Sequence, residues 1–194
     1  MPKSLINEEA VENNALEMLK SEGYEHVYGP NIAPASEGGN GERKNYKEVV
    51  LVERLRKAIK RINPNVPEEV REEAVKKIIR TESQKLELNN QHFHKLLTEG
   101  VNVEFRKSGR IVHEEIKIID FDNIKNNEFT AINQFTIIEE NYNRRPDILI
   151  FVNGLPLVLF ELKNPADEDA TMNNAFNQIE TYKIQIPSLF RFNE

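Results

Sequence analysis

Two apolar runs of sequence, separated only by Asn153-Gly154, constrain this chain more than any other feature. They lie within RRPDILIFVNGLPLVLFELKNP, residues 144–165. Residues 147–152 and 155–161 lack the alternation of apolar and polar residues that is typical of a strand with one wet face. We therefore expect both faces of both strands to be covered, as in the centre of a sheet. Asn-Gly between two such runs predicts a tight β-hairpin turn.

Charged side chains occupy the open end of this predicted hairpin. Glu161 and Lys163 are two residues apart on one strand, so their side chains leave the same face. A strict two-residue turn would pair residue 152 with 155 and place Asp147 opposite Phe160, on the other face. A three-residue loop or a β-bulge would instead place Asp147 opposite Glu161. We predict this second register, in which Asp147, Glu161 and Lys163 converge.

Two carboxylates held together beside apolar strands predict a bound cation. Without one, their mutual repulsion would force a proton onto at least one of them. Oxygen ligands at a partly open site suit Mg²⁺, which keeps water molecules and binds beside phosphate. Lys163 is placed to orient or deprotonate an attacking water and to offset charge on a phosphorane-like transition state. The combination favours hydrolysis of phosphodiesters. The alternative, a structural ion pair at the strand ends, would leave the desolvation of its charges poorly compensated.

Apolar residues that recur at intervals of three and four predict five helices. The expected segments are 7–22 with Asn7 as N-cap, 46–62, a segment that starts at Pro67 and includes Ile78, 83–98, and 171–184. The chain is therefore rich in helix on both sides of its strands.

Alternating apolar residues predict antiparallel strands between residues 101 and 118 and again near 135–137, and residues 189–192 resemble the start of a further strand. The glycine- and proline-rich segment 29–45 predicts a mobile loop. Together these elements predict an α/β fold with a mixed central β-sheet flanked by helices, and with a helical insertion at about 46–98.

Charge and composition exclude several classes of function. The chain has no cysteine, which rules out disulfides and thiolate metal sites, and its net charge of −6 argues against a general nucleic-acid binder. The basic runs in 54–61 and 71–80 fit solvated helix faces, a local DNA face or a docking surface. His92, His94 and His113 fit ordinary histidines rather than metal ligands. No signal peptide and no apolar run of about 20 residues occurs, so we expect a cytoplasmic protein without a membrane partner.

Several motifs resemble those of known nucleases. Pro146-Asp147 followed by Glu161-Leu162-Lys163 resembles the PD-(D/E)xK signature, and its place at the ends of two adjacent buried strands strengthens the match. Gln178 and Tyr182, four residues apart on one predicted helix face, resemble the QxxxY element of recombination nucleases and type I restriction enzymes. EEAVENNALEMLKSEGY, NYKEVVLVERLRKAIKRINP and the hairpin resemble the amino-terminal region of the R subunit of type I restriction-modification enzymes. The resemblance covers nearly the whole chain.

This resemblance implies a PD-(D/E)xK, or restriction-endonuclease-like, fold and a domain that cleaves double-stranded DNA without sequence specificity of its own. In that family an ATP-driven motor translocates DNA before cutting, and separate methyltransferase and specificity subunits choose the site. No GxxxxGK[ST] loop occurs in the 194 residues, so ATP chemistry is expected only of motor domains that are absent here. We interpret residues 1–194 as the endonuclease domain of a longer polypeptide.

The resemblance also implies roles for individual residues. Mg²⁺ would be bound by Asp147, Glu161 and the Leu162 carbonyl, and Lys163 would hold the attacking water. Gln178 and Tyr182 would position DNA or the lysine. A glutamate of the first helix often adds a metal contact in such nucleases, and the candidates here are Glu8, Glu12 and Glu17, of which Glu12 fits best.

Two other functions stay open at this stage. One is a non-catalytic module with a nuclease fold that docks a DNA motor onto its partners. The other is a stand-alone repair exonuclease. Cutting that persists after loss of Lys163 would favour docking, whereas progressive shortening of linear DNA would favour an exonuclease.

Overall fold

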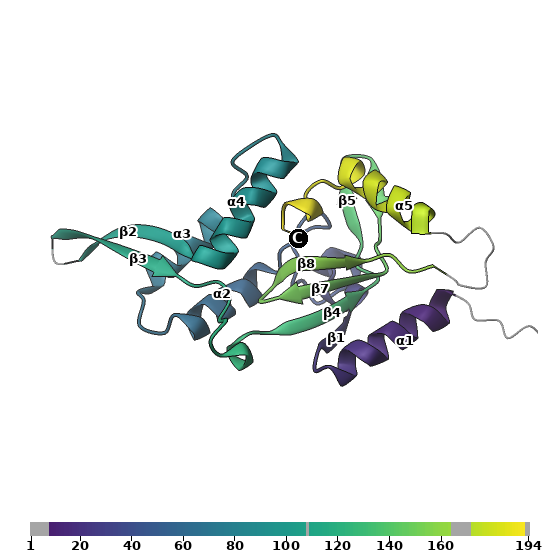
Figure 1. Ribbon diagram of the computed structural model, residues 1–194, viewed down its shortest axis with the longest axis horizontal. Coiled ribbons are helices and arrows are strands. Elements are labelled where there is room, and N and C mark those ends of the chain that lie inside the picture. Colours follow the sequence, from purple (N-terminus) through teal and green to yellow (C-terminus); the bar gives the residue numbers. More distant parts are fainter. Residues whose placement is uncertain (1–7, 108, 164–171, 193–194) are drawn as a thin grey trace, which may run out of the picture.

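A mixed four-stranded sheet forms the centre of the computed structural model (Figure 1). The structure describes residues 8–107, 109–163 and 172–192. The strands of this sheet, in spatial order, are β1 (Glu25–Tyr28), β4 (Phe129–Asn133), β7 (Ile148–Val152) and β8 (Leu155–Phe160). β1 runs parallel to β4, whereas the other two pairings are antiparallel. The predicted α/β architecture with a mixed sheet is therefore confirmed; the predicted N-cap Asn7 lies outside the described residues.

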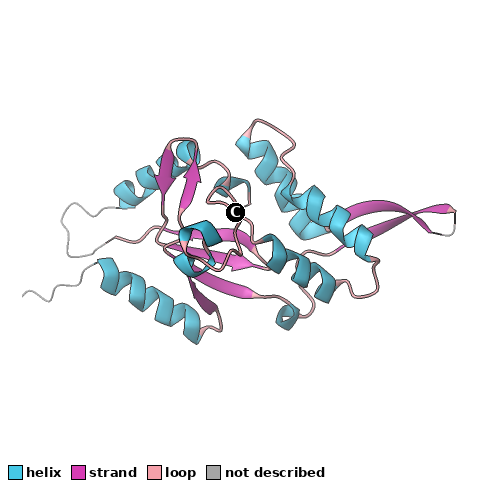
Figure 2. Ribbon diagram, turned by 180° about the vertical axis from the view of Figure 1, so that it is seen from behind, coloured by secondary structure: helices cyan, strands magenta, loops and turns pink. Residues whose placement is uncertain are grey.

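Helices cover both faces of the sheet (Figures 1 and 2). α1 (Glu8–Ser21) packs on the face that carries Ile148 and Ile150. The alternate residues of β7, Leu149 and Phe151, belong to the larger core on the other face, which includes Tyr182 of α5 (Met172–Gln185). Because successive side chains of a strand point to opposite faces, a strand covered on both sides is apolar throughout. This confirms the prediction for β7, whose five residues are all buried.

A mainly helical part extends from one end of the sheet (Figure 1). It consists of α2 (Val52–Ile62), α3 (Glu68–Ile79), α4 (Leu86–Glu99) and the hairpin of β2 (Val101–Lys107) and β3 (Arg110–Ile116). A second small hairpin, β5 (Ile137–Glu139) with β6 (Tyr142–Arg144), precedes β7. α2 begins later than the predicted residue 46, because the Leu51 N–H donates to the carbonyl of Gly154 at 2.9 Å instead of to a helical carbonyl. None of the described helices is long and apolar enough to cross a membrane.

Two predictions on the C-terminal side of the sheet are wrong. β8 is not a central strand but lies at the edge of the described sheet, and its Val158 and Phe160 are 43% and 36% exposed. An apolar run alone does not show which neighbour covers it. Residues 189–192 do not start a strand but form the 3₁₀ helix η4 (Leu189–Arg191). Their apolar side chains pack on a helix instead: the Phe192 ring meets Phe93 of α4 edge to face, with centroids 5.2 Å apart.

The segment 29–45, predicted to be a mobile loop, is tied to the core. It contains the 3₁₀ helices η1 (Gly29–Ile32) and η2 (Ala35–Glu37). The buried Arg43 guanidinium donates hydrogen bonds to three backbone carbonyls, those of Glu48, Thr136 and Tyr46. It also stacks on the Phe135 ring, 3.8 Å from its centroid. Burial lowers the pKa of Arg43 to about 10, so it remains charged at neutral pH.

The Asn153-Gly154 turn fastens the central hairpin to its surroundings. Both residues have positive φ, 53° and 82°, as a tight hairpin turn of the Asn-Gly type requires. The fully buried Asn153 side chain donates to the carbonyl of Ile118 at 2.9 Å and accepts the N–H of Glu128 at 2.8 Å. Gly154 lies against α2, where a Cβ would be 2.5 Å from the carbonyl oxygen of Leu51. The predicted turn is therefore confirmed, and it requires glycine for two reasons.

Replacing Gly154 with alanine should destabilise the protein more than replacing Gly109, the glycine of the β2–β3 turn. Both have positive φ, which costs an alanine about 1–2 kcal/mol. Only at Gly154 does the new methyl group meet backbone, which should add roughly 1–3 kcal/mol. Chemical denaturation of Gly154→Ala and Gly109→Ala measures the difference. Equal losses of unfolding free energy would contradict the packing that we describe.

Candidate active site

A β-bulge sets the register of the central hairpin. Val152 pairs with Leu155 across the two-residue turn, and Ile150 pairs with Val158, but Phe151 pairs with Pro156. β8 therefore contains one extra residue, Leu157, and Ile148 pairs with Phe160. The next residues outward are Asp147 and Glu161, which consequently face each other, as the predicted bulge requires. The backbone N–H of Leu162 donates to Asp147 Oδ2 at 2.6 Å and joins the two strand ends.

Lys163 connects this strand end to α5. Its ammonium group donates to Glu161 Oε1 at 3.2 Å and to Gln178 Oε1 at 2.7 Å. Gln178 Nε2 in turn donates to the hydroxyl of Tyr182 at 2.7 Å. The structure thus places four of the five predicted catalytic side chains in one continuous chain of contacts, from Glu161 to Tyr182. The fifth, Asp147, lies opposite Glu161.

Both carboxylates are partly removed from water, which makes their charged forms costly. Burial raises the pKa of Asp147, and the charges of Glu12 and Glu8 add to this, while the Leu162 N–H and the charge of Lys163 act in the opposite direction. Burial also raises the pKa of Glu161, as does the charge of Asp147, against the opposing effect of Lys163. Tyr182 is affected in the same way: burial raises its pKa, and the two carboxylates contribute.

One carboxylate oxygen at this site lacks a partner. The Glu161 side chain is 3% exposed, and its buried Oε2 has no hydrogen bond of normal geometry to a described residue, although the Tyr182 hydroxyl lies near enough to the carboxylate to oppose the rise that burial causes in the pKa of Glu161. A buried, unpartnered oxygen costs free energy unless a cation or donor reaches it. Carboxylate oxygens are the donors that Mg²⁺ prefers, so the residues present fit such an ion. Leu162, whose carbonyl is the predicted third donor, is fixed here through its N–H.

The glutamates of α1 differ in their relation to this site. Glu17 pairs with Lys20 at 2.8 Å on the exposed side of the helix. Glu12 accepts hydrogen bonds from Asn133 at 2.6 Å and from Gln134. Its charge acts on Asp147, but in the described part of the chain no three His, Asp or Glu side chains gather as a metal-binding group. The structure therefore brings Glu12 near Asp147 without making it a third member of a ligand cluster.

Sequence reasoning did not single out the residues that hold Glu12. Asn133 is the last residue of β4 and Gln134 follows it, and His26 of β1 contacts Asn133 at 2.9 Å. The only signal in the sequence is that two amides follow directly on the apolar residues of 129–132. A polar pair at a strand end is too common to indicate a site without the coordinates.

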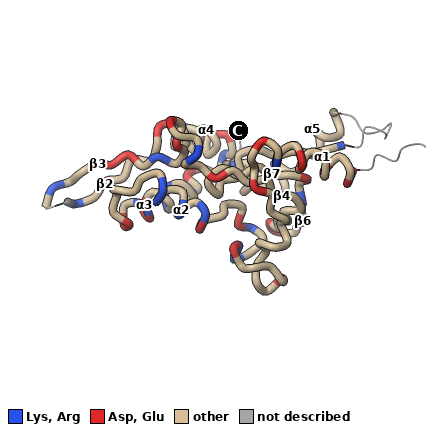
Figure 3. Tube along the Cα trace, turned by 90° about the horizontal axis from the view of Figure 1, so that it is seen from below, with Lys and Arg blue, Asp and Glu red and all other residues tan. Residues whose placement is uncertain are grey.

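Some of the remaining charged candidates form ion pairs. Both signs of charge occur on the part of the molecule formed by α2, α3 and α4 (Figure 3), but α2 carries five bases and only one acid, Glu53. Arg54 pairs with Glu42 and Glu128, and Arg56 with Glu72. His113 lies 3.5 Å from Glu104 across the β2–β3 hairpin. Acidic partners therefore offset only part of the positive charge in the basic runs, at Arg54, Arg56 and Lys76.

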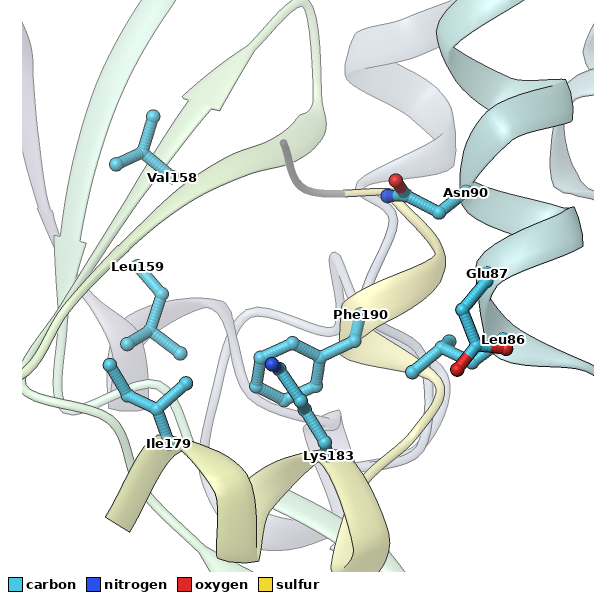
Figure 4. A pocket seen from close by; sticks show the side chains of 8 residues that line it. All are labelled: Leu86, Glu87, Asn90, Val158, Leu159, Ile179, Lys183 and Phe190. Atoms are coloured by element: carbon cyan, nitrogen blue, oxygen red, sulfur yellow. The ribbon is translucent and has the colours of Figure 1, made fainter. Parts of the chain in front are cut away.

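A cleft beside α5 is separate from the acidic pair, Asp147 and Glu161. It has a volume of about 460 Å³ and lies between α4, β8, α5 and η4 (Figure 4). Its walls include Val158, Leu159 and Phe190, and none of the predicted catalytic residues lines it. The acidic pair sits at the end of the sheet instead, where the first turn of α1 and the start of α5 also lie (Figure 1).

Fold and site together define an α/β protein with two facing carboxylates and a lysine at the end of a central antiparallel hairpin. The sequence profile of the family described as "Type I restriction enzyme R protein N terminus" matches residues 5–194. The chain therefore belongs to this family.

Two relatives illustrate the match. The type I restriction enzyme HindI endonuclease subunit of Haemophilus influenzae is 42% identical over 191 residues, which cover 98% of this chain and 18% of that protein. A candidate type I restriction enzyme MjaIXP endonuclease subunit of Methanocaldococcus jannaschii is 35% identical over 191 residues, 96% of this chain and 18% of that protein. The chain thus spans less than a fifth of the length of these relatives.

Neutralising the acidic pair should stabilise the metal-free protein at neutral pH. Because the pKa values of Asp147 and Glu161 are raised in the folded state, their contribution to stability is fully present below the ordinary carboxyl pKa. It is lost as the pH rises through the raised values. The double variant Asp147→Asn, Glu161→Gln removes this loss. Its melting temperature should exceed that of the unsubstituted protein at pH 7, and the gap should narrow towards pH 4.

The matched control is Glu17→Gln, because the contact with Lys20 lowers the pKa of this exposed glutamate. Its substitution should give no gain at pH 7. A gain at Glu17 equal to that at the acidic pair would contradict the role that we assign to burial.

Proposed function

We propose that this chain is the Mg²⁺-dependent DNA endonuclease domain of a type I restriction enzyme R subunit, with a PD-(D/E)xK, restriction-endonuclease-like fold. The observation that carries the proposal is the chain of contacts from Glu161 through Lys163 and Gln178 to Tyr182, opposite a second carboxylate at Asp147. A structural ion pair needs one acid and one base. It does not account for two acids with raised pKa values and a buried oxygen without a partner.

Asp147 and Glu161 would hold the metal ion, with the Leu162 carbonyl as a further oxygen donor. When bound, Mg²⁺ supplies a Lewis acid that polarises the phosphate and offsets its charge. Lys163 orients or deprotonates the water that attacks phosphorus. Its ammonium group does not pair with Glu161 alone, because Gln178 accepts a second and shorter hydrogen bond from it.

Tyr182 contributes by fixing the amide of Gln178. Since Gln178 Nε2 donates to the Tyr182 hydroxyl, Gln178 Oε1 must face Lys163, where only an acceptor is useful. Both residues therefore act on the lysine, which agrees with one of the two roles expected for the QxxxY element.

The substrate in this proposal is double-stranded DNA, cut without sequence preference of the domain itself. Arg145, exposed directly before Pro146, is available for a phosphate contact, whereas Arg144 is engaged with Gln185 of α5. Translocation by an ATP-driven motor would come from the rest of the R polypeptide. Site choice would come from methyltransferase and specificity subunits of a cytoplasmic complex.

The decisive test is Lys163→Ala in the full-length R subunit, assembled with its other subunits. We expect DNA cutting to fall by about 10²–10⁴-fold, the range for loss of a group that moves or holds a proton. ATP hydrolysis should persist, because the motor is separate. The control is Lys183→Ala, which removes a lysine of α5 that pairs with Glu180 at the surface; this variant should cut normally.

Two outcomes would contradict the proposed function. Unchanged cutting by Lys163→Ala would favour a module that only docks the motor. Progressive shortening of linear DNA by the unsubstituted protein, without internal cuts, would favour an exonuclease.

Metal binding can be measured without cleavage. Mg²⁺ should raise the melting temperature of the DNA-free protein, because an ion that binds only the folded state stabilises it. The variant Asp147→Asn, Glu161→Gln should lose this rise, whereas Glu17→Gln should keep it. An equal rise in all three proteins would place the ion elsewhere.

A further inference from the structure

Glu12 of α1 is held by two side-chain amides, that of Asn133 at the end of β4 and that of Gln134 directly after it. Asn133 Nδ2, at the end of β4, donates to Glu12 Oε1 at 2.6 Å, and Gln134 Nε2 lies 3.3 Å from Oε2. Behind them, His26 Nε2 of β1 contacts Asn133 Oδ1 at 2.9 Å. The carboxylate of α1 and the imidazole of β1 are thus linked through one amide of β4, a strand more than 100 residues further along the chain.

The direction of each hydrogen bond in the series from Glu12 through Asn133 to His26 is determined. A carboxylate only accepts, so Asn133 must turn its NH₂ group towards Glu12 and its carbonyl oxygen towards His26. His26 must then carry its hydrogen on Nε2. Because Asn133 is 8% exposed, water has little access to compete for these bonds. The Glu12 carboxylate is consequently oriented from behind by two successive donors.

The backbone is strained at the same point. Gln134 has φ of 55°, a left-handed conformation that a residue with a side chain rarely adopts. The neighbouring chain is packed closely against it: a Cβ on Gly29 would be 2.6 Å from the Gln134 carbonyl oxygen. Strain of this kind persists only where the surroundings impose it, and it is concentrated at functional sites.

The clamp, as we call the hydrogen-bonded group of Glu12, Asn133, Gln134 and His26, lies next to the acidic pair. β4 is antiparallel to β7, and Asn133 pairs with Ile148, the residue that follows Asp147. The clamped carboxylate is therefore held one strand away from Asp147, at the same end of the sheet. Its charge contributes to the raised pKa of Asp147, after burial.

We propose that Asn133 is a positioning residue of the cleavage site: supported by His26 and flanked by Gln134, it holds the Glu12 carboxylate where its charge reaches Asp147. The inference rests on the proposed function and adds residues that act through Glu12 on the metal-binding pair. The competing view is that Asn133 only satisfies buried polar groups between α1 and the sheet. The two views predict different results for a variant that keeps the hydrogen bond between positions 12 and 133 but moves the negative charge from position 12 to position 133. If Asn133 only satisfies buried polar groups, the Mg²⁺ requirement should then be normal; if it positions Glu12, the requirement should rise.

The test exchanges donor and acceptor in the full-length subunit within its assembled enzyme. Asn133→Asp sets two carboxylates against each other and displaces Glu12. We expect the Mg²⁺ concentration for half-maximal cutting to rise about 10–100-fold, the usual effect of losing a residue that orients a metal ligand. Glu12→Gln should do the same. The double variant Glu12→Gln, Asn133→Asp restores an amide-to-carboxylate hydrogen bond, so its melting temperature should recover while its Mg²⁺ requirement stays high.

Two further measurements separate positioning from packing. The rise in melting temperature that Mg²⁺ causes without DNA should shrink in Asn133→Asp and in the double variant. His26→Gln keeps an N–H donor and should stay close to the unsubstituted protein, whereas His26→Leu should need more Mg²⁺. The His26 pair carries the test if Asn133→Asp does not fold.

A normal Mg²⁺ requirement in Asn133→Asp and His26→Leu, or recovery of cutting together with stability in the double variant, would overturn the inference. Lys163→Ala in the same assay separates this from failure of the proposed function. If Lys163→Ala abolishes cutting while the Asn133 and His26 variants are normal, only the positioning role fails. If Lys163→Ala cuts normally, the nuclease proposal itself fails.

Discussion

The arrangement of the site depends on one extra residue in β8. Without the bulge at Leu157, the two-residue turn would pair Asp147 with Phe160 and separate it from Glu161 by a face of the sheet. With the bulge, Asp147 meets Glu161, and the Leu162 N–H reaches the Asp147 carboxylate at 2.6 Å. This bond fixes the strand end from which Lys163 extends to α5. The contacts with Gln178 and Tyr182 follow from the same register.

The site is costly for the fold that carries it. Burial and mutual repulsion oppose the ionisation of both acids, and Glu161 keeps a buried oxygen without a partner. The compensation lies a few residues away: all of β7 is buried between α1 and the larger core, and the Asn153-Gly154 turn is locked against α2. The tightly packed apolar strand β7 therefore holds Asp147 and Glu161 in place although their charges oppose this arrangement.

How far the sequence predicts this structure depends on the range of the interactions involved. Local signals were sufficient for the turn and for the helical segments, and the chemistry of paired carboxylates predicted a bulge that spacing alone left open. Contacts between residues far apart in the sequence could not be predicted. Val158 and Phe160 looked central but lie at an edge, residues 189–192 looked extended but pack as a 3₁₀ helix, and Arg43 ties down a segment that composition predicted to be mobile. The role that we propose for Asn133 could not be predicted from the sequence, because it depends on contacts with His26 of β1 and Glu12 of α1.

The position of the acidic pair bears on the kind of substrate it suits. A small ligand is usually enclosed by its pocket, and this fold has a cleft of about 460 Å³ that would suit one (Figure 4). The carboxylates and the lysine lie outside it, at the end of the sheet where Asn133, Ile148 and Phe160 pair and where α1 and α5 begin (Figure 1). A DNA duplex, the substrate in the proposed function, is far longer than such a cleft and would have to approach the end of the sheet from outside. Under the proposed function, the position of the acidic pair at the end of the sheet therefore suits a long polymer better than a small ligand held in the cleft between α4, β8, α5 and η4.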